Sequence, residues 1–378
     1  MLRKTVLTAT AGAAVIALGL AGCSSSSSTK TSGASAAPSN TKVGVLLPDT
    51  VSAIRWTSAD PDELNSQCLK YKLNCTIDNA NGSDSEMEAQ ATQMINAGVG
   101  VLIIADLDAT SGDKIEQQAK AAGVTVIDYD RLDTGGTAQY YVSFDNVAVG
   151  KAQATALQQC SQVASLSSVK WVELDGAPTD NNATLFKQGY APILTAKWGA
   201  PLADQAIANW TPATAGTTFQ TMLNQYGSQI NAVMVANDGM AGPVEQAIAG
   251  AGLTGKIAVT GQDASPAGLD AIMSGAQCLT VYKPVAGEAD IAIQIADQVL
   301  SGKTPASTIG GEAATTVKDP TTGREVPSYL AAPIAITKAN VALPVTQGYE
   351  TAAAVCGVSQ AIATLCNSNG ITYTYTAS

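Results

Sequence analysis

The feature that most constrains the fold is a regular alternation that begins at residue 42. Short runs rich in valine and isoleucine alternate with longer stretches rich in alanine, glutamine and leucine. Such alternation is typical of βαβ units, in which a helix connects two parallel strands of one sheet. Two sets of about five such units follow one another along the chain. The pattern therefore predicts an α/β protein with two similar lobes, each a doubly wound parallel sheet covered by helices on both faces.

The predicted elements fall into an N-terminal and a C-terminal set. The first set has strands at 43–47, 75–78, 101–105, 124–128 and 140–143, and helices at 59–71, 85–97, 112–122 and 149–162. The second set has strands at 169–174, 205–208, 232–236, 257–260 and 279–282, and helices at 182–197, 217–225, 241–251, 264–274 and 286–300.

The N-terminus has the pattern of an export signal. A basic start is followed by an uncharged stretch that ends in the letters LAGC, with the cysteine at Cys23. This predicts a secretory signal peptide over residues 1–22. The LAGC sequence resembles the bacterial lipoprotein box, in which the cysteine is lipidated; an ordinary cleaved signal with a stray cysteine is the alternative. Residues 23–41 are rich in Ser, Thr, Ala and Gly and predict a flexible tether. We expect an exported protein that is attached to the outer face of the cell membrane by its lipid alone.

Composition excludes several classes of function. Lys and Arg number 20 against 31 Asp and Glu, for a formal net charge of −11. A chain this acidic has no basic surface to neutralise phosphates, so nucleic acid is not an expected partner. The sequence contains no histidine. This excludes Ser-His-Asp and Cys-His catalysis and every His-ligated metal site. We expect no cofactor and no metal.

Six cysteines remain when Cys23 is set aside. An even number in an exported chain predicts disulfides, with fifteen possible connectivities. Short spacing favours two pairs and leaves the third by elimination, although some of these cysteines could instead be buried thiols. The favoured pairs are Cys68–Cys75, Cys356–Cys366 and Cys160–Cys278.

Polar or charged side chains follow almost every predicted strand. Open parallel sheets bind ligands outside the carboxyl ends of their strands, so these side chains are candidates for binding. Asp and Asn at such positions can instead cap the following helix. We assign the capping role to Asp106, Asp145, Asn146, Asp175 and Asp238. Arg131, Trp210 and Lys283 are poor caps and predict a binding role.

The residue types at these strand ends suit a small, hydroxyl-rich ligand such as a carbohydrate. Asp and Asn accept from or bridge hydroxyls, Arg and Lys donate to hydroxyl and ring oxygens, and an indole covers the apolar C–H face. Arg55-Trp56 and Trp210 supply both kinds of contact. Plain core packing is the alternative for each tryptophan.

Several of these segments, in this order, resemble the D-xylose-binding proteins of bacterial ABC importers, which are type I periplasmic binding proteins. The resemblance spans residues 42–345. The segments that carry it are 43–49 with Arg55-Trp56, Asn79-Ala80-Asn81-Gly82, Tyr129-Asp130-Arg131, Ser143-Phe144-Asp145-Asn146, Asp180-Asn181-Asn182-Ala183, Asn237-Asp238, Gly261-Gln262-Asp263 and Val281-Tyr282-Lys283-Pro284.

The resemblance implies two lobes joined by a three-segment hinge, with crossings near 145–146, 283–284 and 331–333. The N-terminal lobe would comprise 42–145 plus 284–331, and the C-terminal lobe 146–283 plus 332–378. The implied sugar contacts are Arg55, Asp130, Arg131, Asn182, Trp210, Asn237, Asp263 and Lys283, with Trp56 and Asp180 beside them.

The implied function is that of a monomeric, non-catalytic receptor. It would capture a monosaccharide, D-xylose or a similar aldose, and deliver it to the permease of an ABC importer. The loop at 48–54 is less charged than in the family, which leaves xylose, arabinose, glucose and a linear polyol open as ligands. Residues 346–378 form an additional tail without a predicted function.

An extracellular carbohydrate-active enzyme is the main alternative, because glycosidases need two carboxylates and no histidine. Asp130 and Asp263 could form that pair. We expect the adjacent Arg131 and Lys283 to lower both carboxyl pKa values, which is wrong for a general acid. A receptor for another small polyol and a sugar-responsive repressor are further alternatives, and the export signal argues against the repressor.

Overall fold

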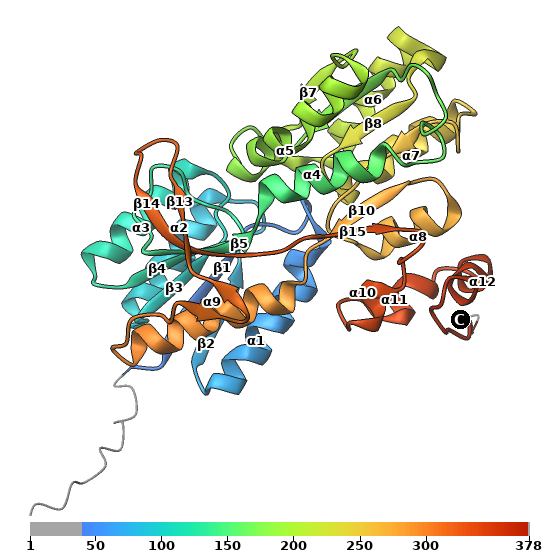
Figure 1. Ribbon diagram of the computed structural model, residues 1–378. Helices are drawn as coiled ribbons and strands as arrows, with labels where there is room; N and C mark the ends of the chain where they lie inside the picture. The colour runs from blue at the N-terminus through green and yellow to red at the C-terminus, as the bar shows by residue number, and fades with distance from the viewer. Residues whose placement is uncertain (1–39, 377–378) are drawn as a thin grey trace, which may run out of the picture. The chain divides into compact units, whose positions relative to one another are not determined.

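A computed structural model describes residues 40–376 (Figure 1). The predicted signal peptide 1–22, the predicted lipidation site Cys23 and nearly all of the tether 23–41 lie outside the described residues. Within residues 40–376, no helix is both long and apolar enough to cross a membrane.

The N-terminal lobe is built on a seven-stranded sheet with the order β13-β14-β5-β4-β3-β1-β2. All neighbouring strands run parallel except the edge strand β13, which is antiparallel to β14. The strands are β1 (Lys42–Leu47), β2 (Asn74–Asn79), β3 (Val101–Ile104), β4 (Thr125–Tyr129), β5 (Tyr140–Phe144), β13 (Thr315–Lys318) and β14 (Glu325–Ala331).

Helices cover both faces of this sheet because successive strand side chains point to opposite faces. Val45 and Leu47 pack with α1 (Ala59–Tyr71) and α9 (Val285–Leu300), while Leu46 packs with the helices of the other face. The remaining elements of the lobe are η1 (Ile54–Thr57), α2 (Asp84–Asn96), α3 (Ala109–Ala121), β11 (Thr308–Ile309) and β12 (Glu312–Ala313).

The C-terminal lobe contains a four-stranded parallel sheet with the order β7-β6-β8-β9. Two of its helices, α4 and α5, approach closely at Gly150 and Gly189. A Cβ atom at Gly150 would lie 2.0 Å from the carbonyl oxygen of Phe186, so only glycine fits this crossing. The elements are β6 (Trp171–Asp175), β7 (Asp204–Ala206), β8 (Ala232–Val235), β9 (Ala258–Val259), α4 (Asn146–Leu157), α5 (Asn181–Trp198), α6 (Pro212–Tyr226), α7 (Asp238–Gly250), α8 (Pro266–Ser274), η2 (Ala208–Trp210) and η3 (Gly227–Gln229).

Three segments link the two lobes. They connect β5 to α4, β10 (Leu279–Tyr282) to α9, and β14 to β15 (Ile334–Thr337). β10 and β15 pair antiparallel as a separate two-stranded sheet. The α/β class with parallel sheets and two lobes is confirmed, while the lobe boundaries given above stay a prediction.

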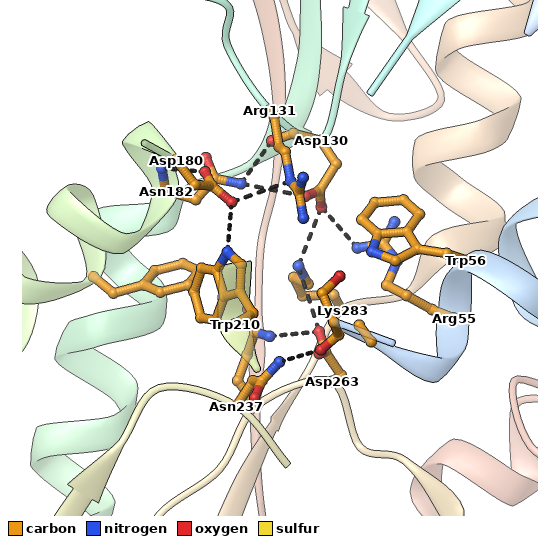
Figure 2. A pocket seen from close by; sticks show the side chains of 14 residues that line it. Arg55, Trp56, Asp130, Arg131, Asp180, Asn182, Trp210, Asn237, Asp263 and Lys283 are labelled. Atoms are coloured by element: carbon orange, nitrogen blue, oxygen red, sulfur yellow. Dashed lines mark hydrogen bonds and ion pairs between the residues drawn. The ribbon is translucent and has the colours of Figure 1, made fainter. Parts of the chain in front are cut away.

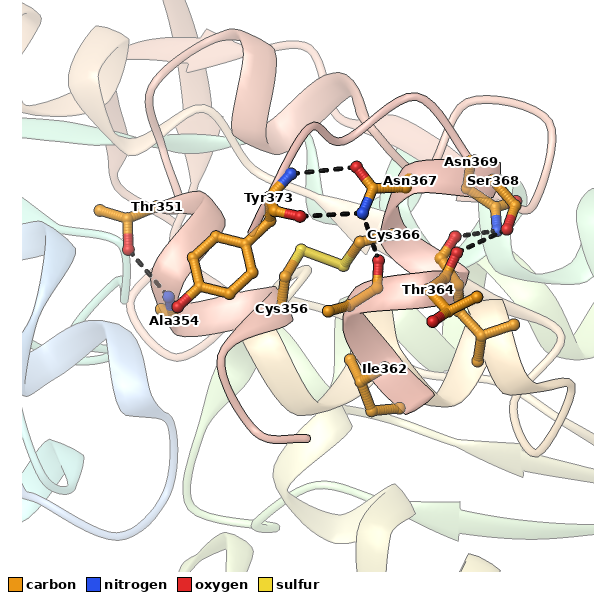
Figure 3. The surroundings of a disulfide bond; sticks show 12 residues. Thr351, Ala354, Cys356, Ile362, Thr364, Cys366, Asn367, Ser368, Asn369 and Tyr373 are labelled. Atoms are coloured by element: carbon orange, nitrogen blue, oxygen red, sulfur yellow. Dashed lines mark hydrogen bonds between the residues drawn. A yellow bond between two sulfur atoms is a disulfide. The ribbon is translucent and has the colours of Figure 1, made fainter. Parts of the chain in front are cut away.

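The chain ends in a tail of three short helices, α10 (Leu343–Thr346), α11 (Ala352–Cys356) and α12 (Gln360–Ser368). α11 and α12, which are red in Figure 1, contact α8. The Cys356–Cys366 disulfide joins α11 to α12 (Figure 3). The other two disulfides are Cys68–Cys75 and Cys160–Cys278, so the structure contains the two pairs that short spacing favours and the third pair that elimination leaves.

Candidate binding site

Side chains from both lobes line a cavity whose empty volume, including the open solvent at its mouth, is about 310 Å³ (Figure 2). All ten residues that are predicted from the sequence to bind the ligand line it: Arg55, Trp56, Asp130, Arg131, Asp180, Asn182, Trp210, Asn237, Asp263 and Lys283. Four further lining residues were not selected: Ser52, Ala53, Phe186 and Gln262. The structure thus brings the ten residues together, and their role in binding stays a prediction.

Asp130 is the centre of the charge network in this cavity. Its Oδ2 accepts hydrogen bonds from Arg55 Nη1 at 2.7 Å and Lys283 Nζ at 3.1 Å, and its Oδ1 accepts from Asn182 Nδ2 at 3.2 Å. Burial opposes ionisation of this carboxyl, but the neighbouring cations Lys283, Arg55 and Arg131 outweigh burial and hold its pKa below the ordinary value. Asp130 is therefore a carboxylate at neutral pH.

The backbone of Asp130 is held as firmly as its side chain. The residue follows β4 with a φ of 62°, a left-handed conformation that non-glycine residues seldom adopt. Its carbonyl oxygen accepts from Ser143 Oγ at 2.6 Å, Tyr141 OH at 3.2 Å and Asn182 Nδ2 at 2.9 Å. These bonds keep the unusual turn in place and aim the carboxylate into the cavity.

Arg55 reaches the cavity from η1 and is only 1% exposed. Its guanidinium binds Asp60 through Nε and Nη2, at 2.7 and 2.6 Å, and Glu288 through Nη2 at 2.7 Å. Burial raises the pKa of Glu288 to about 8, against the opposing effect of Arg55. Asp60 and Glu288 therefore fix the guanidinium from behind, and Nη1 is left to face Asp130.

The Trp56 ring lies against two guanidinium groups. The guanidinium carbon of Arg55 lies 4.5 Å from the ring centroid, and that of Arg131 lies 5.5 Å away. Trp56 Nε1 is buried and has no hydrogen-bond partner among the described residues. A buried N–H group without a partner is unfavourable, so this group is available to a ligand.

Arg131 connects the lobes through Asp180. Arg131 Nε lies 3.1 Å from Asp180 Oδ2, and that oxygen also accepts from Trp210 Nε1 at 3.1 Å. Burial raises the pKa of Asp180, and Arg131 opposes this shift. The Trp210 ring sits directly over Gly176, where a Cβ atom would lie 2.0 Å from the ring. Gly176 is thus needed for the indole to occupy this wall of the cavity.

Asp263 and Lys283 line another part of the cavity. Lys283 Nζ lies 3.5 Å from Asp263 Oδ1, and Gln262 Nε2 donates to the same oxygen. Burial raises the pKa of Asp263, although Lys283 and Arg55 lower it in part. The expectation that neighbouring cations lower both carboxyl pKa values is therefore wrong for Asp263, because desolvation of this fully enclosed group is the larger effect.

Asn237 bridges the two lobes. Its Oδ1 accepts from Met240 N at 3.0 Å and caps α7, while its Nδ2 donates to the carbonyl oxygen of Ser52 at 2.8 Å. Asp180 likewise caps α5 by accepting from Asn182 N at 2.8 Å. These two residues therefore combine a capping role with a place in the cavity wall.

The capping roles assigned from sequence hold only in part. Asp145 caps α4, as predicted, by accepting from Ala148 N at 2.9 Å. Asp106 does not cap α3, whose N-cap is Asp108. Asp106 is buried instead, and its carbonyl oxygen accepts from Arg131 Nη1 at 2.7 Å.

The other three predicted caps have different partners. Asp238 is the first residue of α7, and its carboxylate accepts from Ser265 and Gln277. Asp175 binds Lys187 at 2.8 Å, and Asn146 donates to Asn182 Oδ1 at 2.7 Å. Each of these three residues lies at or next to a strand end, as expected, but another residue caps the helix that follows.

Comparison with known proteins places the chain in a family. Residues 43–304 match the family described as periplasmic binding protein domain. The D-xylose-binding periplasmic protein of Escherichia coli is 33% identical over 304 residues, which cover 79% of this chain and 88% of that protein. A multiple sugar-binding periplasmic receptor of Rhizobium radiobacter is 29% identical over 324 residues, covering 81% and 89%.

A solved structure gives the same assignment. The carbohydrate transporter solute binding protein of Chloroflexus aurantiacus, in complex with D-glucose, is similar with a TM-score of 0.73 and 27% identity, covering 82% of this chain and 97% of that one. These similar proteins are solute-binding proteins and not enzymes. The resemblance stated from the sequence is thereby confirmed, and the chain belongs to the type I periplasmic binding protein family.

Proposed function

We propose that this protein captures one monosaccharide, or a polyol of similar size, in the cavity between its lobes and delivers it to an ABC importer. The observation that carries the proposal is the charge balance of the cavity. Its lining contains three cations (Arg55, Arg131 and Lys283) and three carboxylates (Asp130, Asp180 and Asp263). A balanced lining favours a neutral ligand with many hydrogen-bonding groups over a charged one.

The aromatic walls of the cavity support a sugar ligand. Trp56, Trp210 and Phe186 line the cavity, and the Phe186 and Trp210 rings meet edge to face with centroids 6.4 Å apart. Such rings cover the apolar C–H face of a sugar, while the charged groups reach its hydroxyls.

Contacts from both lobes would couple binding to lobe closure. Asp130 and Arg131 follow β4 of the N-terminal lobe, while Asn237 and Trp210 belong to the C-terminal lobe. A ligand that contacts both sets stabilises the closed arrangement, because only that arrangement offers every partner. A closed, loaded receptor is the form that a permease would recognise.

D-xylose is the first candidate ligand. The E. coli relative, named for D-xylose binding, is 33% identical over most of both chains. D-glucose is the second candidate because it is the ligand in the C. aurantiacus structure. The two aldoses differ by one hydroxymethyl group, so both could make the same ring contacts.

Export and anchoring complete the proposal. Members of the periplasmic binding protein family act outside the cytoplasm, which supports a signal peptide over residues 1–22. We further propose lipid attachment at Cys23, on the basis of the LAGC sequence. Cys23→Ala should release the protein from the membrane fraction of cells, and unchanged membrane association would contradict the anchor.

A ligand screen tests the binding function. We expect D-xylose, D-glucose, L-arabinose or xylitol to raise the unfolding midpoint of the purified protein, because a ligand bound only by the folded state stabilises it. Arg131→Ala should abolish most of this shift. The matched control is Arg324→Ala, because Arg324 donates to the carbonyl oxygens of Ala138 and Gly136 and does not line the cavity.

Two results would contradict the proposal. The first is the absence of any shift with this set of sugars and polyols in the wild-type protein. The second is equal affinity of wild-type protein and Arg131→Ala for the best ligand, measured by titration calorimetry. Release of free xylose from a xyloside would support the enzyme alternative instead.

A further inference from the structure

The C-terminal tail packs against two segments that carry residues of the candidate site. Ala264 and Tyr282, the neighbours in sequence of Asp263 and Lys283, belong to the same hydrophobic cluster as Val355, Cys356 and Cys366. Ala264 is fully buried in this cluster, and Tyr282 is 3% exposed. The tail therefore forms part of the support for the cavity wall that carries Asp263 and Lys283.

Asp263 has an unusual backbone conformation. Its φ is 102°, and that of Ala264 is 52°, so two successive non-glycine residues have positive φ values. Such conformations are unfavourable and persist only where the surroundings fix them. Here the Asp263 N–H donates to Val281 O at 2.8 Å.

The carbonyl of Asp263 is held from the tail. The hydroxyl of Tyr349, in the segment between α10 and α11, donates to Asp263 O at 2.9 Å. Burial raises the pKa of Tyr349 well above its ordinary value, so the hydroxyl keeps its proton across the physiological range. Tyr349 thus fixes one side of this strained peptide as a permanent donor.

Other contacts fix the position of Tyr349 itself. Its ring packs against Tyr282 with centroids 5.0 Å apart and an angle of 45° between the planes. Its N–H donates to Pro344 O at 3.0 Å. The Cys356–Cys366 disulfide ties together the two helices that follow (Figure 3).

We propose that Tyr349 is a positioning residue for ligand binding, which acts by holding the backbone of Asp263 so that its carboxylate faces the cavity. This inference rests on the proposed function. It gives the tail, residues 346–378, a role in binding although none of its residues up to 376 lines the cavity.

Tyr349→Phe tests the proposal because it removes one hydroxyl and keeps the ring. The probe is whichever of D-xylose, D-glucose, L-arabinose and xylitol binds the wild-type protein most tightly. We expect the dissociation constant to rise about threefold to tenfold, the effect of losing one hydrogen bond. Tyr373→Phe is the matched control, since Tyr373 lies in the same tail with its hydroxyl near Gly357. Its affinity should match that of wild-type protein.

A second measurement separates positioning from general support of the fold. In an Asp263→Asn background, Tyr349→Phe should weaken binding much less, because the carboxylate it positions is gone. In an Asn237→Ala background, it should have its full effect. A purely structural role would instead lower the unfolding midpoint of the ligand-free protein while leaving the dissociation constant unchanged.

The outcomes distinguish this inference from the proposed function. If wild-type protein binds a sugar and Tyr349→Phe binds it equally well, the positioning role is refuted and the proposed function stands. Equal losses of affinity from Tyr349→Phe in the wild-type and Asp263→Asn backgrounds would also refute it. If wild-type protein binds none of the four probes, the proposed function fails and this inference fails with it.

Discussion

Replacing Asp130 with asparagine tests the charge network at its centre. The amide keeps the size of the side chain but removes the negative charge that faces two buried cations. Arg55 would retain Asp60 and Glu288 as partners, whereas Lys283 would retain only Asp263, at 3.5 Å. The substitution therefore leaves Lys283 as the poorly compensated charge.

The loss of stability caused by Asp130→Asn can be estimated from these remaining partners. Removing one member of a buried ion pair destabilises a protein by about 3–5 kcal/mol. Because Arg55 keeps Asp60 and Glu288 as partners and Lys283 keeps Asp263, we expect the loss of stability to lie near the lower end of this range, at about 3 kcal/mol. A ligand would also lose a charged acceptor, which corresponds to about a tenfold to hundredfold fall in affinity.

Urea denaturation measures the first effect and titration calorimetry the second. Asp145→Asn is the matched control, because Asp145 is exposed, caps α4, and asparagine caps a helix as well as aspartate does. Asp145→Asn should change neither the free energy of unfolding nor the affinity for the ligand. If the free energy of unfolding of Asp130→Asn lies within about 1 kcal/mol of the wild-type value and the sugar affinity is unchanged, Asp130 is not the centre of the network.

Three further predictions concern the disulfides, Gly176 and Glu245. Removing the Cys160–Cys278 disulfide by a double Cys→Ser change should lower the free energy of unfolding, measured with urea, by about 5 kcal/mol, and removing Cys68–Cys75 should lower it by about 2.5 kcal/mol. The difference is expected because the sequence separations are 118 and 7 residues. Equal losses would contradict this dependence on loop length. Gly176→Ala should push the Trp210 ring out of place and lower affinity in calorimetry; unchanged affinity would mean that this ring makes no ligand contact. Burial raises the pKa of Glu245 from 4.5 to about 8, so the folded protein binds the proton more tightly and stability falls as pH rises through that range. Glu245→Gln should therefore have the higher unfolding midpoint at about pH 9 and an equal one near pH 4, and parallel pH profiles would refute this titration.

The regular βα pattern could be predicted because it depends on local periodicity. The helix predicted at 59–71 has those bounds, and the strand predicted at 140–143 is one residue longer in the structure. The strand predicted at 257–260 shortens to Ala258–Val259, since only two of its residues pair with β8. Where a strand ends depends on how far the adjacent strand continues the backbone hydrogen bonds between them. The sequence of one strand alone does not contain that information.

The elements after residue 300 could not be predicted in the same way. The edge strand β13 (Thr315–Lys318) is mostly exposed and has one neighbour, so it needs no apolar alternation. The tail helices α10 and α11 are four and five residues long, too short to be stable alone. Their positions depend on the hydrophobic cluster around Val355 and on a disulfide, which are tertiary features.

The candidate site shows why strand-end residues cannot be divided into caps and binding residues. A helix that follows a parallel strand begins at the carboxyl edge of the sheet, so its N-cap lies beside the crevice where ligands bind. Capping uses one acceptor atom of Asp or Asn and leaves the second polar atom free. In Asn237 the second atom donates to Ser52 of the other lobe, and in Asp180 it accepts from Trp210. Because one side chain can perform both tasks, finding a cap at a strand end does not argue against a role in binding.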